Sequence, residues 1–380
     1  MKLTEALLRR AEEALSFDPR EERRALLDRT AVAVAEPIVL RHRIAQALGE
    51  GSDAAQLAVD RLLSGSDQLN ASYLERGMIA ADAVARIELR NGESELVGCA
   101  TGFMVSPHLL LTNHHVLQTA DEAAQSWAHF RYEFDALGRM VESCVFALEP
   151  SQFFFTDRTL DVTIVAVASE TPDRRQRVSR FGWLRLPASP DTIVPGEWLS
   201  MVHHPAGRPK QLVLRQNLLI RSSDAELWYV TETASASSGA PVFNDSWQVV
   251  AVHGIGAPAR DRGGRVLTID GEPWSDGGDE ARIVWRAGVG TRASAIVACL
   301  AATNADHPLI AELLADSEVD ACDAIVIPLG AGADAPSPAE PDASFRVPHT
   351  VAVPSANGAP MRITVPQGNG SIHAPASVSN

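Results

Sequence analysis

The sequence predicts a mainly β protein, an antiparallel barrel or sandwich with a helical segment before it and a low-complexity tail after it. Three observations lead to this fold class. From about residue 83, many short β-prone runs follow one another, each bounded by turn residues. Before them, apolar residues recur at helical spacing. After about residue 303, Gly, Ala, Pro, Asp and Ser become dominant.

Residues 1–70 form the predicted helical segment. Between Leu7 and Leu15 the apolar residues recur at intervals of three or four, and Glu and Arg occupy the other face. A further Ala- and Leu-rich run ends at Leu63, and Gly65 follows it as a stop signal. We therefore expect helices here, joined to the next domain by a polar connection.

Residues 76–302 form the predicted central domain. Asn91-Gly92 separates two β-prone runs and predicts a hairpin turn. Residues 289–302 are predicted to form one helix that closes the domain. The predicted strands are AVARIEL (83–89), LVGCATGFMV (96–105), HLLLT (108–112), DVTIVAV (161–167), WLSMV (198–202), QLVLR (211–215), LWYVTE (227–232), APVF (240–243) and QVVAVHG (248–254).

Residues 303–380 are predicted to be a largely disordered tail. Residues 330–344 are almost all Gly, Ala, Pro, Asp and Ser, which cannot bury enough apolar surface to offset the entropy of the chain. The β-prone patch at 345–354 is too small to fold alone.

The net charge and the cysteines indicate which partners to exclude and which cellular compartment to expect. The formal net charge is −15, with 48 acidic against 33 basic residues, so we expect neither a nucleic-acid nor a membrane partner. No run approaches the roughly 18 apolar residues of a membrane span, and charges interrupt any secretory signal at the N-terminus. Four distant cysteines, without CxxC spacing, favour free thiols in a reducing, cytoplasmic compartment. They are Cys99, Cys144, Cys299 and Cys322.

Metal and cofactor motifs are missing from the sequence. It contains no Walker A loop, dinucleotide fingerprint or HExxH motif, so we expect no cofactor and no metal. His203 and His204 are adjacent on a predicted strand and therefore point to opposite faces, which favours a structural role over a shared metal. We interpret His114 and His129 in the same way.

Three residues together indicate nucleophilic catalysis. Ser238 lies in TASASSGAPVF, whose small residues permit a tight turn before a strand. His115 ends the run LLLTNHH, and Asp161 opens the run DVTIVAV. A serine hydroxyl becomes a nucleophile when a histidine takes its proton, and an acid fixes the tautomer of that histidine. The order His, Asp, Ser, each at the edge of a β-run, predicts Ser238 as nucleophile, His115 as base and Asp161 as orienting acid.

These motifs resemble those of trypsin-like serine peptidases, specifically the bacterial glutamyl-endopeptidase-like branch, over residues 76–302. TGFMVSPHLLLTNHHVL is similar to the family's strand pair and catalytic histidine, and His115 rather than His114 stands at the histidine's position. LDVTIVAV, SSGAPVF with VVAVHG, and GVGTRASAIVACL resemble the aspartate strand, the nucleophile turn with its pocket strand, and the closing helix. The resemblance implies two six-stranded antiparallel β-barrels, and an endopeptidase that forms an acyl-enzyme with a protein or peptide substrate.

The resemblance also assigns the oxyanion hole to the backbone N–H groups of Ala236 and Ser238. The family normally has glycine where Ala236 stands, and glycine tolerates backbone angles that a β-carbon penalises. An alanine can hold this peptide in a non-productive orientation until substrate binds. The alternative function is therefore a catalytically silent or partner-gated trypsin-like binding module.

Two substrate preferences remain open. Thr233 and His253 stand where the glutamyl branch contacts a substrate carboxylate, and both side chains can donate to an anion. Glu232 stands where relatives that cleave after Lys or Arg place an aspartate, and an inward carboxylate would favour a basic residue. The first arrangement implies cleavage after Glu or Asp, and the second implies cleavage after Lys or Arg.

The N-terminal extension has three interpretations. Many trypsin-like enzymes complete their pocket with a new N-terminus, so cleavage between about Ser64 and Gly77 could activate the chain. The helices could instead recruit a regulatory protein partner, or they could form a structural cap on the barrel. An esterase of the α/β-hydrolase kind is disfavoured, because the order Ser, acid, His and the GxSxG elbow are missing.

Overall fold

The computed structural model divides the chain into two compact units, Met1–Pro328 and Leu329–Asn380. In the second unit, β17 (Thr350–Pro354) and β18 (Pro360–Thr364) form an antiparallel pair. The structure describes residues 8–9, 17–27, 69, 71–230, 237–276, 278, 282–317, 325–326, 350–354 and 360–364.

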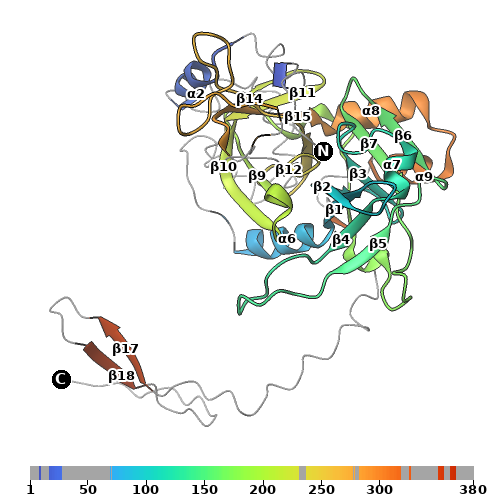
Figure 1. Cartoon of the computed structure of the whole chain (residues 1–380), viewed down its shortest axis with the longest axis horizontal. Coiled ribbons are helices and arrows are strands. Elements are labelled where there is room, and N and C mark those ends of the chain that lie inside the picture. The colour runs from blue at the N-terminus through green and yellow to red at the C-terminus, as the bar shows by residue number, and fades with distance from the viewer. Residues whose placement is uncertain are drawn as a thin grey trace, which may run out of the picture. The chain divides into compact units, whose positions relative to one another are not determined.

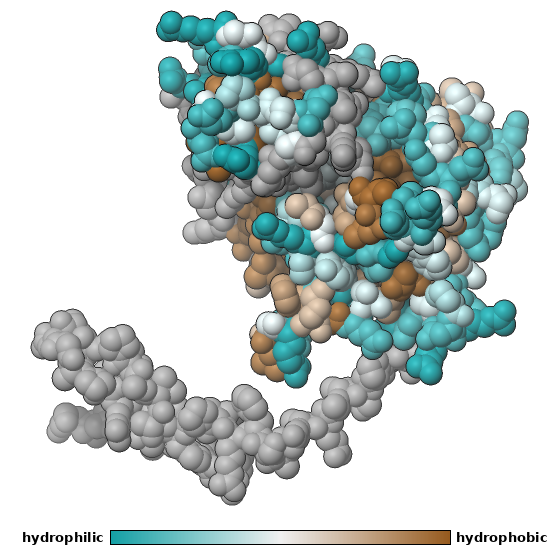
Figure 2. Space-filling view, in the orientation of Figure 1, coloured by the Kyte–Doolittle hydropathy of each residue, from teal (hydrophilic) through white to brown (hydrophobic). Residues whose placement is uncertain are grey.

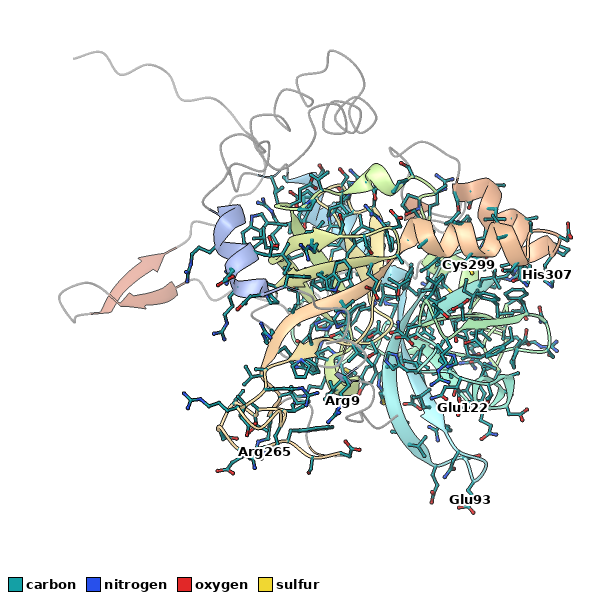
Figure 3. All side chains as sticks on the ribbon, turned by 90° about the horizontal axis from the view of Figure 1, so that it is seen from above. Arg9, Glu93, Glu122, Arg265, Cys299 and His307 are labelled. Atoms are coloured by element: carbon teal, nitrogen blue, oxygen red, sulfur yellow. The ribbon has the colours of Figure 1, made fainter. Side chains whose placement is uncertain are left out.

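The first sheet has seven strands in the order β5-β4-β1-β2-β3-β7-β6, and the paired strands are antiparallel. A bridge between Leu148 and Val167 joins the ends of β5 and β7, which closes six of the strands into a barrel. The predicted hairpin is present between β1 and β2, and Glu93 marks its exposed tip in Figure 3. The strands are β1 (Val84–Arg90), β2 (Leu96–Met104), β3 (Leu109–Thr112), β4 (Trp127–Phe130), β5 (Cys144–Ala147), β6 (Phe154–Asp157) and β7 (Val162–Ala166).

The second sheet has the order β11-β10-β9-β12-β13-β15-β14, and β11 also pairs with β15. This additional pairing closes six strands into an antiparallel barrel, which Figure 1 shows beside the first sheet. The mainly β, double-barrel prediction is thereby confirmed. The strands are β9 (Trp198–His203), β10 (Gln211–Ser222), β11 (Glu226–Val230), β12 (Pro241–Phe243), β13 (Val249–His253), β14 (Ala257–Pro258) and β15 (Trp285–Arg292).

The end of the central domain differs from the prediction of one helix over 289–302. Residues 289–292 belong to β15, and helix α8 begins only at Ala293. The reason is tertiary: β15 is hydrogen-bonded to β11 on one side and to β13 on the other. Pairing on both sides overrides the local helical pattern.

Helices cover parts of the barrels. The core of the first barrel continues into α8 and α9, which Figure 1 shows beside that sheet. Helix α9 lies within the predicted tail, where its Ile310 and Leu313 are buried. In Figure 3, Cys299 marks α8 and His307 marks the connection to α9. The described helices are α2 (Pro19–Leu27), α6 (Ser72–Asp82), α7 (Ala120–Ala124), α8 (Ala293–Thr303) and α9 (Pro308–Ser317).

Helix α6 ties the two barrels together. It leads directly into β1 of the first barrel, while its Tyr73 ring lies 5.0 Å from the ring of the fully buried Trp247 in the second. The Tyr73 hydroxyl is 2.5 Å from Ser200 Oγ on β9. A Cβ at Gly77 would overlap the Trp247 ring, so glycine permits this close approach.

The surface gives two further observations. On the face seen in Figure 2, polar residues cover most of the described surface and apolar residues form smaller groups among them. None of the described helices is long and apolar enough to span a membrane. Cys99, Cys144 and Cys299 are free thiols, and Cys322 lies outside the described residues.

Candidate active site

His115 and Asp161 are in direct contact. Strand β3 ends at Thr112, and the turn that follows brings the His115 ring to the buried end of the barrel, where the residue is only 4% exposed. His115 Nδ1 lies 2.7 Å from Asp161 Oδ2, and the His115 backbone N–H donates to Oδ1 at 3.0 Å. Both carboxylate oxygens therefore hold the same histidine.

The backbone of Asp161 is unusual. Its φ of 54° lies in the left-handed region, which aspartate tolerates better than most residues. Asn113 Nδ2 donates to Asp161 O at 2.9 Å, and Thr291 Oγ1 donates to Leu160 O at 2.5 Å. Since Thr291 belongs to β15, both barrels fix the peptide segment that aims this carboxylate at His115.

The Ser238 turn lies against the first barrel. The Thr101 N–H on β2 donates to Ser238 O at 3.0 Å, and the Gly239 N–H donates to His253 O on β13 at 2.9 Å. Gly239 has a φ of 83°, and a Cβ there would overlap Thr101 O and Thr112 Oγ1. The turn therefore requires glycine at this position, and it seats Ser238 beside the end of the strand that leads to His115.

The structure does not join Ser238 Oγ to His115. His115 Nε2 is buried and has no hydrogen-bond partner among the residues that the structure describes. Because the Asp161 carboxylate accepts from Nδ1, the ring proton of a neutral His115 lies on Nδ1 and Nε2 carries a lone pair. That nitrogen is prepared to accept a proton. Ser238 itself is largely buried, with 8% of its surface exposed.

His253 was expected to contact a substrate carboxylate, and in the structure its ring also contacts a side chain of the protein. Its Nδ1 lies 2.5 Å from the Tyr229 hydroxyl on β11. Burial, together with the nearby His203 and His115, lowers the pKa of His253 to about 3. Burial also raises the pKa of Tyr229. Both groups are consequently neutral near neutral pH.

The other two proposed pocket residues, Glu232 and Thr233, lie outside the described residues. The same is true of Ala236, so of the two expected oxyanion donors only the Ser238 N–H belongs to the described turn.

The adjacent histidines His203 and His204 face different neighbours. His203 Nδ1 is hydrogen-bonded to Ser237 Oγ, and burial lowers the pKa of His203 to about 4. The His204 N–H donates to Thr101 Oγ1 at 3.0 Å, and its Nδ1 donates to Arg208 O at 3.0 Å. The two rings have different partners, and His204 lies one residue beyond the end of β9.

The remaining histidines of interest have local partners. His114 Nδ1 lies 2.7 Å from Thr156 Oγ1, and His129 Nε2 lies 3.4 Å from Glu88 Oε2. In the part of the chain that the structure describes, no three His, Cys, Asp or Glu side chains are grouped to hold a metal ion.

Two residues of the site were missed from the sequence. Ser237 directly precedes Ser238, and this adjacency indicates that it belongs to the nucleophile turn. The contact of Ser237 with His203, 34 positions away, cannot be predicted from sequence spacing. Tyr229 lies in a predicted strand whose inward face was unassigned, and nothing in the sequence linked it to His253.

The model of one known protein family matches part of this chain. Residues 100–252 match the family model described as a trypsin-like peptidase domain. The matched segment contains His115, Asp161 and Ser238. This part of the chain is therefore similar to a trypsin-like peptidase domain.

Three individual proteins or structures are similar to parts of this chain. An uncharacterized protein of Sinorhizobium fredii, y4fB, is 35% identical over 241 residues, which is 61% of this chain and 36% of that protein. Two crystal structures of Rv3671c in an inactive form are similar, one of them a serine-to-alanine mutant from M. tuberculosis H37Rv. They are 17% and 16% identical, cover 63% and 62% of this chain and 97% and 96% of their own, and have TM-scores of 0.37 and 0.36.

Proposed function

We propose that this chain is a serine endopeptidase that hydrolyses peptide bonds through an acyl-enzyme. The observation that carries the proposal is the 2.7 Å contact between His115 Nδ1 and Asp161 Oδ2. The buried Nε2 of the same ring has no hydrogen-bond partner among the described residues. A base held in this tautomer is what a serine nucleophile requires. The match of this segment to the trypsin-like peptidase domain supports the same conclusion.

The proposed reaction uses three groups in turn. Ser238 Oγ bonds to the carbonyl carbon of the substrate while its proton passes to His115 Nε2. Asp161 stabilises the imidazolium that forms. The imidazolium then gives its proton to the leaving amine as the C–N bond breaks, and water hydrolyses the remaining ester by the same path. The backbone N–H groups of Ser238 and Ala236 would stabilise the oxyanion.

A serine-reactive fluorophosphonate probe tests this function. We expect the native chain to be labelled, the Ser238→Ala variant to lose the label and a matched Ser179→Ala variant to keep it, since Ser179 is exposed and distant in sequence. Label retained in Ser238→Ala would contradict the assignment of the nucleophile.

A partner-gated binding module is the second candidate. The observation that favours it is His115 Nε2, which is buried without a hydrogen-bond partner among the described residues, as expected of a site that awaits rearrangement. A gated site labels only after a partner protein or N-terminal cleavage is supplied. A chain that never labels, under any activating condition, supports a silent module instead.

For the substrate we propose cleavage after Glu or Asp, recognised by Thr233 and His253. Tyr229 keeps its proton and can donate it to His253 Nδ1, which leaves the ring proton on Nε2 for a substrate carboxylate. An inward-facing Glu232 would oppose this and favour Lys or Arg. Peptides varied at the residue before the scissile bond separate these preferences, and equal cleavage of all of them would discard both.

We also propose that the N-terminal segment regulates the site. Leu8 is fully buried against Val266, Trp274 and Ile283, in a cluster that includes Ile255, two positions after His253. In Figure 3, Arg9 and Arg265 lie on the same side of the molecule, in agreement with this packing. Equal labelling rates for the full chain and an N-truncated chain would contradict regulation.

A further inference from the structure

We propose that His203 and Ser237 form a positioning pair that fixes the turn bearing Ser238, and through this turn the reactivity of the Ser238 hydroxyl. The proposal rests on the proposed function of Ser238 as nucleophile and adds two residues that the mechanism above does not use. Neither would touch the substrate, because both act through the backbone of Ser238.

The two side chains meet at the end of β9, where both residues are buried. Ser237 is 4% exposed and His203 is 5% exposed, and Ser237 Oγ is hydrogen-bonded to His203 Nδ1. His203 ends β9, and β9 pairs with β12, which begins at Pro241 directly after the turn. The histidine therefore belongs to the rigid strand next to the turn, and it offers an anchor point that does not depend on the turn itself.

This anchor acts on the peptide that matters most for catalysis. Downstream, the turn is held by backbone bonds from the Thr101 N–H to Ser238 O and from the Gly239 N–H to His253 O. On the amino side, the Ser237 hydroxyl supplies a side-chain anchor. The peptide between Ser237 and Ser238 carries the N–H that would face the oxyanion, so rotation of this peptide would withdraw a donor.

The environment of His203 argues against a second catalytic base. His115 has a carboxylate at its Nδ1, whereas His203 has a serine hydroxyl there. Burial lowers the pKa of His203 to about 4, and no charged group in the described part of the chain offsets this effect. A neutral ring and a hydroxyl can exchange donor and acceptor roles, so the contact anchors the turn without requiring an ion. A base without an orienting acid would be a poor proton acceptor.

The test is a double-mutant cycle read by two measurements. Ser237→Ala and His203→Phe should each slow the labelling of Ser238 by a fluorophosphonate by at least about 10-fold, since misplacing an oxyanion donor costs up to about 10²–10³-fold. The double variant should be no slower than either single variant, because all three lose the same contact. Ser237→Thr keeps the hydroxyl and should label at nearly the native rate. In peptide hydrolysis, kcat should fall while KM is unchanged.

Amide hydrogen exchange at Ser238 and Gly239 is the second measurement, and it does not depend on catalysis. We expect faster exchange in Ser237→Ala than in the native chain and native exchange in Ser237→Thr. Native labelling and exchange rates in Ser237→Ala overturn the proposal, as do labelling losses that multiply in the double variant. If the native chain is never labelled, the proposed function fails. Even then, faster amide exchange in Ser237→Ala supports the positioning role of His203 and Ser237, and unchanged exchange overturns it.

Discussion

Asp161 combines a left-handed backbone with a carboxylate that contacts one histidine through both oxygens. Oδ1 accepts from the His115 backbone N–H and Oδ2 from the ring at Nδ1. The first contact fixes where the carboxylate lies relative to the histidine, and the second fixes which ring nitrogen carries the proton. The chemistry of the site therefore depends on this side chain being an acceptor at both atoms.

Asp161→Asn should lower the labelling rate of Ser238 by roughly 10⁴-fold, the loss typical of an orienting acid that becomes an amide. An amide N–H facing Nδ1 would force the ring proton to Nε2, where the base must be empty. The control is Asp157→Asn, because Asp157 Oδ1 accepts from the Thr159 and Leu160 N–H groups and an amide oxygen can do the same. Equal losses in the two variants would contradict the role of Asp161.

His253 leads to a prediction about pH. Burial holds its pKa at about 3, against an ordinary value of 6.5, so the ring stays neutral from about pH 5 to about pH 8. The preference for a peptide with Glu over one with Gln before the scissile bond should therefore be constant across that range, as measured by the ratio of the two kcat/KM values. A ratio that falls as the pH rises through about 6.5 would indicate recognition by an imidazolium and contradict a neutral donor.

At the level of elements, the turn 237–240 has the tightest requirements. Gly239 must adopt a φ of 83° and must also leave room for Thr101 O and Thr112 Oγ1. The first requirement costs a substituted residue about 1 kcal/mol, and the second would push the turn away from β2 and β3.

Gly239→Ala should abolish labelling and lower the free energy of unfolding by more than about 2 kcal/mol, measured by urea denaturation. Gly138→Ala is the matched control. Gly138 has a similar φ of 74° but nothing within 4 Å of an added Cβ, so only the backbone cost of about 1 kcal/mol remains. Similar losses for both variants would show that the contact with the first barrel is unimportant.

The sequence predicted elements well where the pattern was local. The runs 83–89, 108–112 and 198–202 correspond closely to β1, β3 and β9. Strands β4, β5 and β6 were not predicted: each is only four residues long, and of the three only β4 alternates between buried and partly buried residues. Helix α9 was not predicted because a low-complexity tail was expected there.

The site residues, like the strands and helices, were predictable where the signal is local in sequence. The motifs around His115 and Asp161 were visible because each is continuous in sequence. Their contact spans 46 positions and depends on the backbone of Asp161, which no local pattern specifies. The contacts of Ser237 with His203 and of Tyr229 with His253 likewise depend on how strands pair, so the sequence could not reveal them.

On the scale of the molecule, the candidate site lies where the two barrels meet. The bond from the Thr101 N–H to Ser238 O and the bond from Thr291 Oγ1 to Leu160 O each cross between barrels, and each ends beside a proposed catalytic residue. The contact between Tyr73 and Ser200 links the barrels a third time. Relative displacement of the barrels would therefore separate Ser238 from His115, so activity should be lost before either barrel unfolds.

Three neutral histidines are buried near the boundary between the two barrels, and they make the stability of the whole domain depend on pH. His204 is one of them: burial, with Lys210 nearby, lowers its pKa to about 3, while the unfolded chain has the ordinary value of 6.5. Between these two values the unfolded state binds a proton that the folded state does not. The resulting stability is complete above about pH 6.5 and is lost as the pH falls toward about 3, by up to about 1.4 kcal/mol per pH unit. His203 and His253 act in the same direction.

His204→Asn isolates one of these contributions. An Asn amide can still donate to Arg208 O, as His204 Nδ1 does, but it does not titrate. The variant should be less stable than the native chain at neutral pH because it packs less volume, yet its free energy of unfolding should fall less on acidification, by roughly 1–2 kcal/mol between about pH 7 and about pH 5. Urea denaturation at several pH values measures this difference. His108→Asn, at an exposed histidine, serves as the control for the substitution itself. If the free energy of unfolding varied with pH equally in the native chain and in His204→Asn, His204 would bind its proton as readily in the folded state as in the unfolded one. The boundary between the barrels would then be open to water.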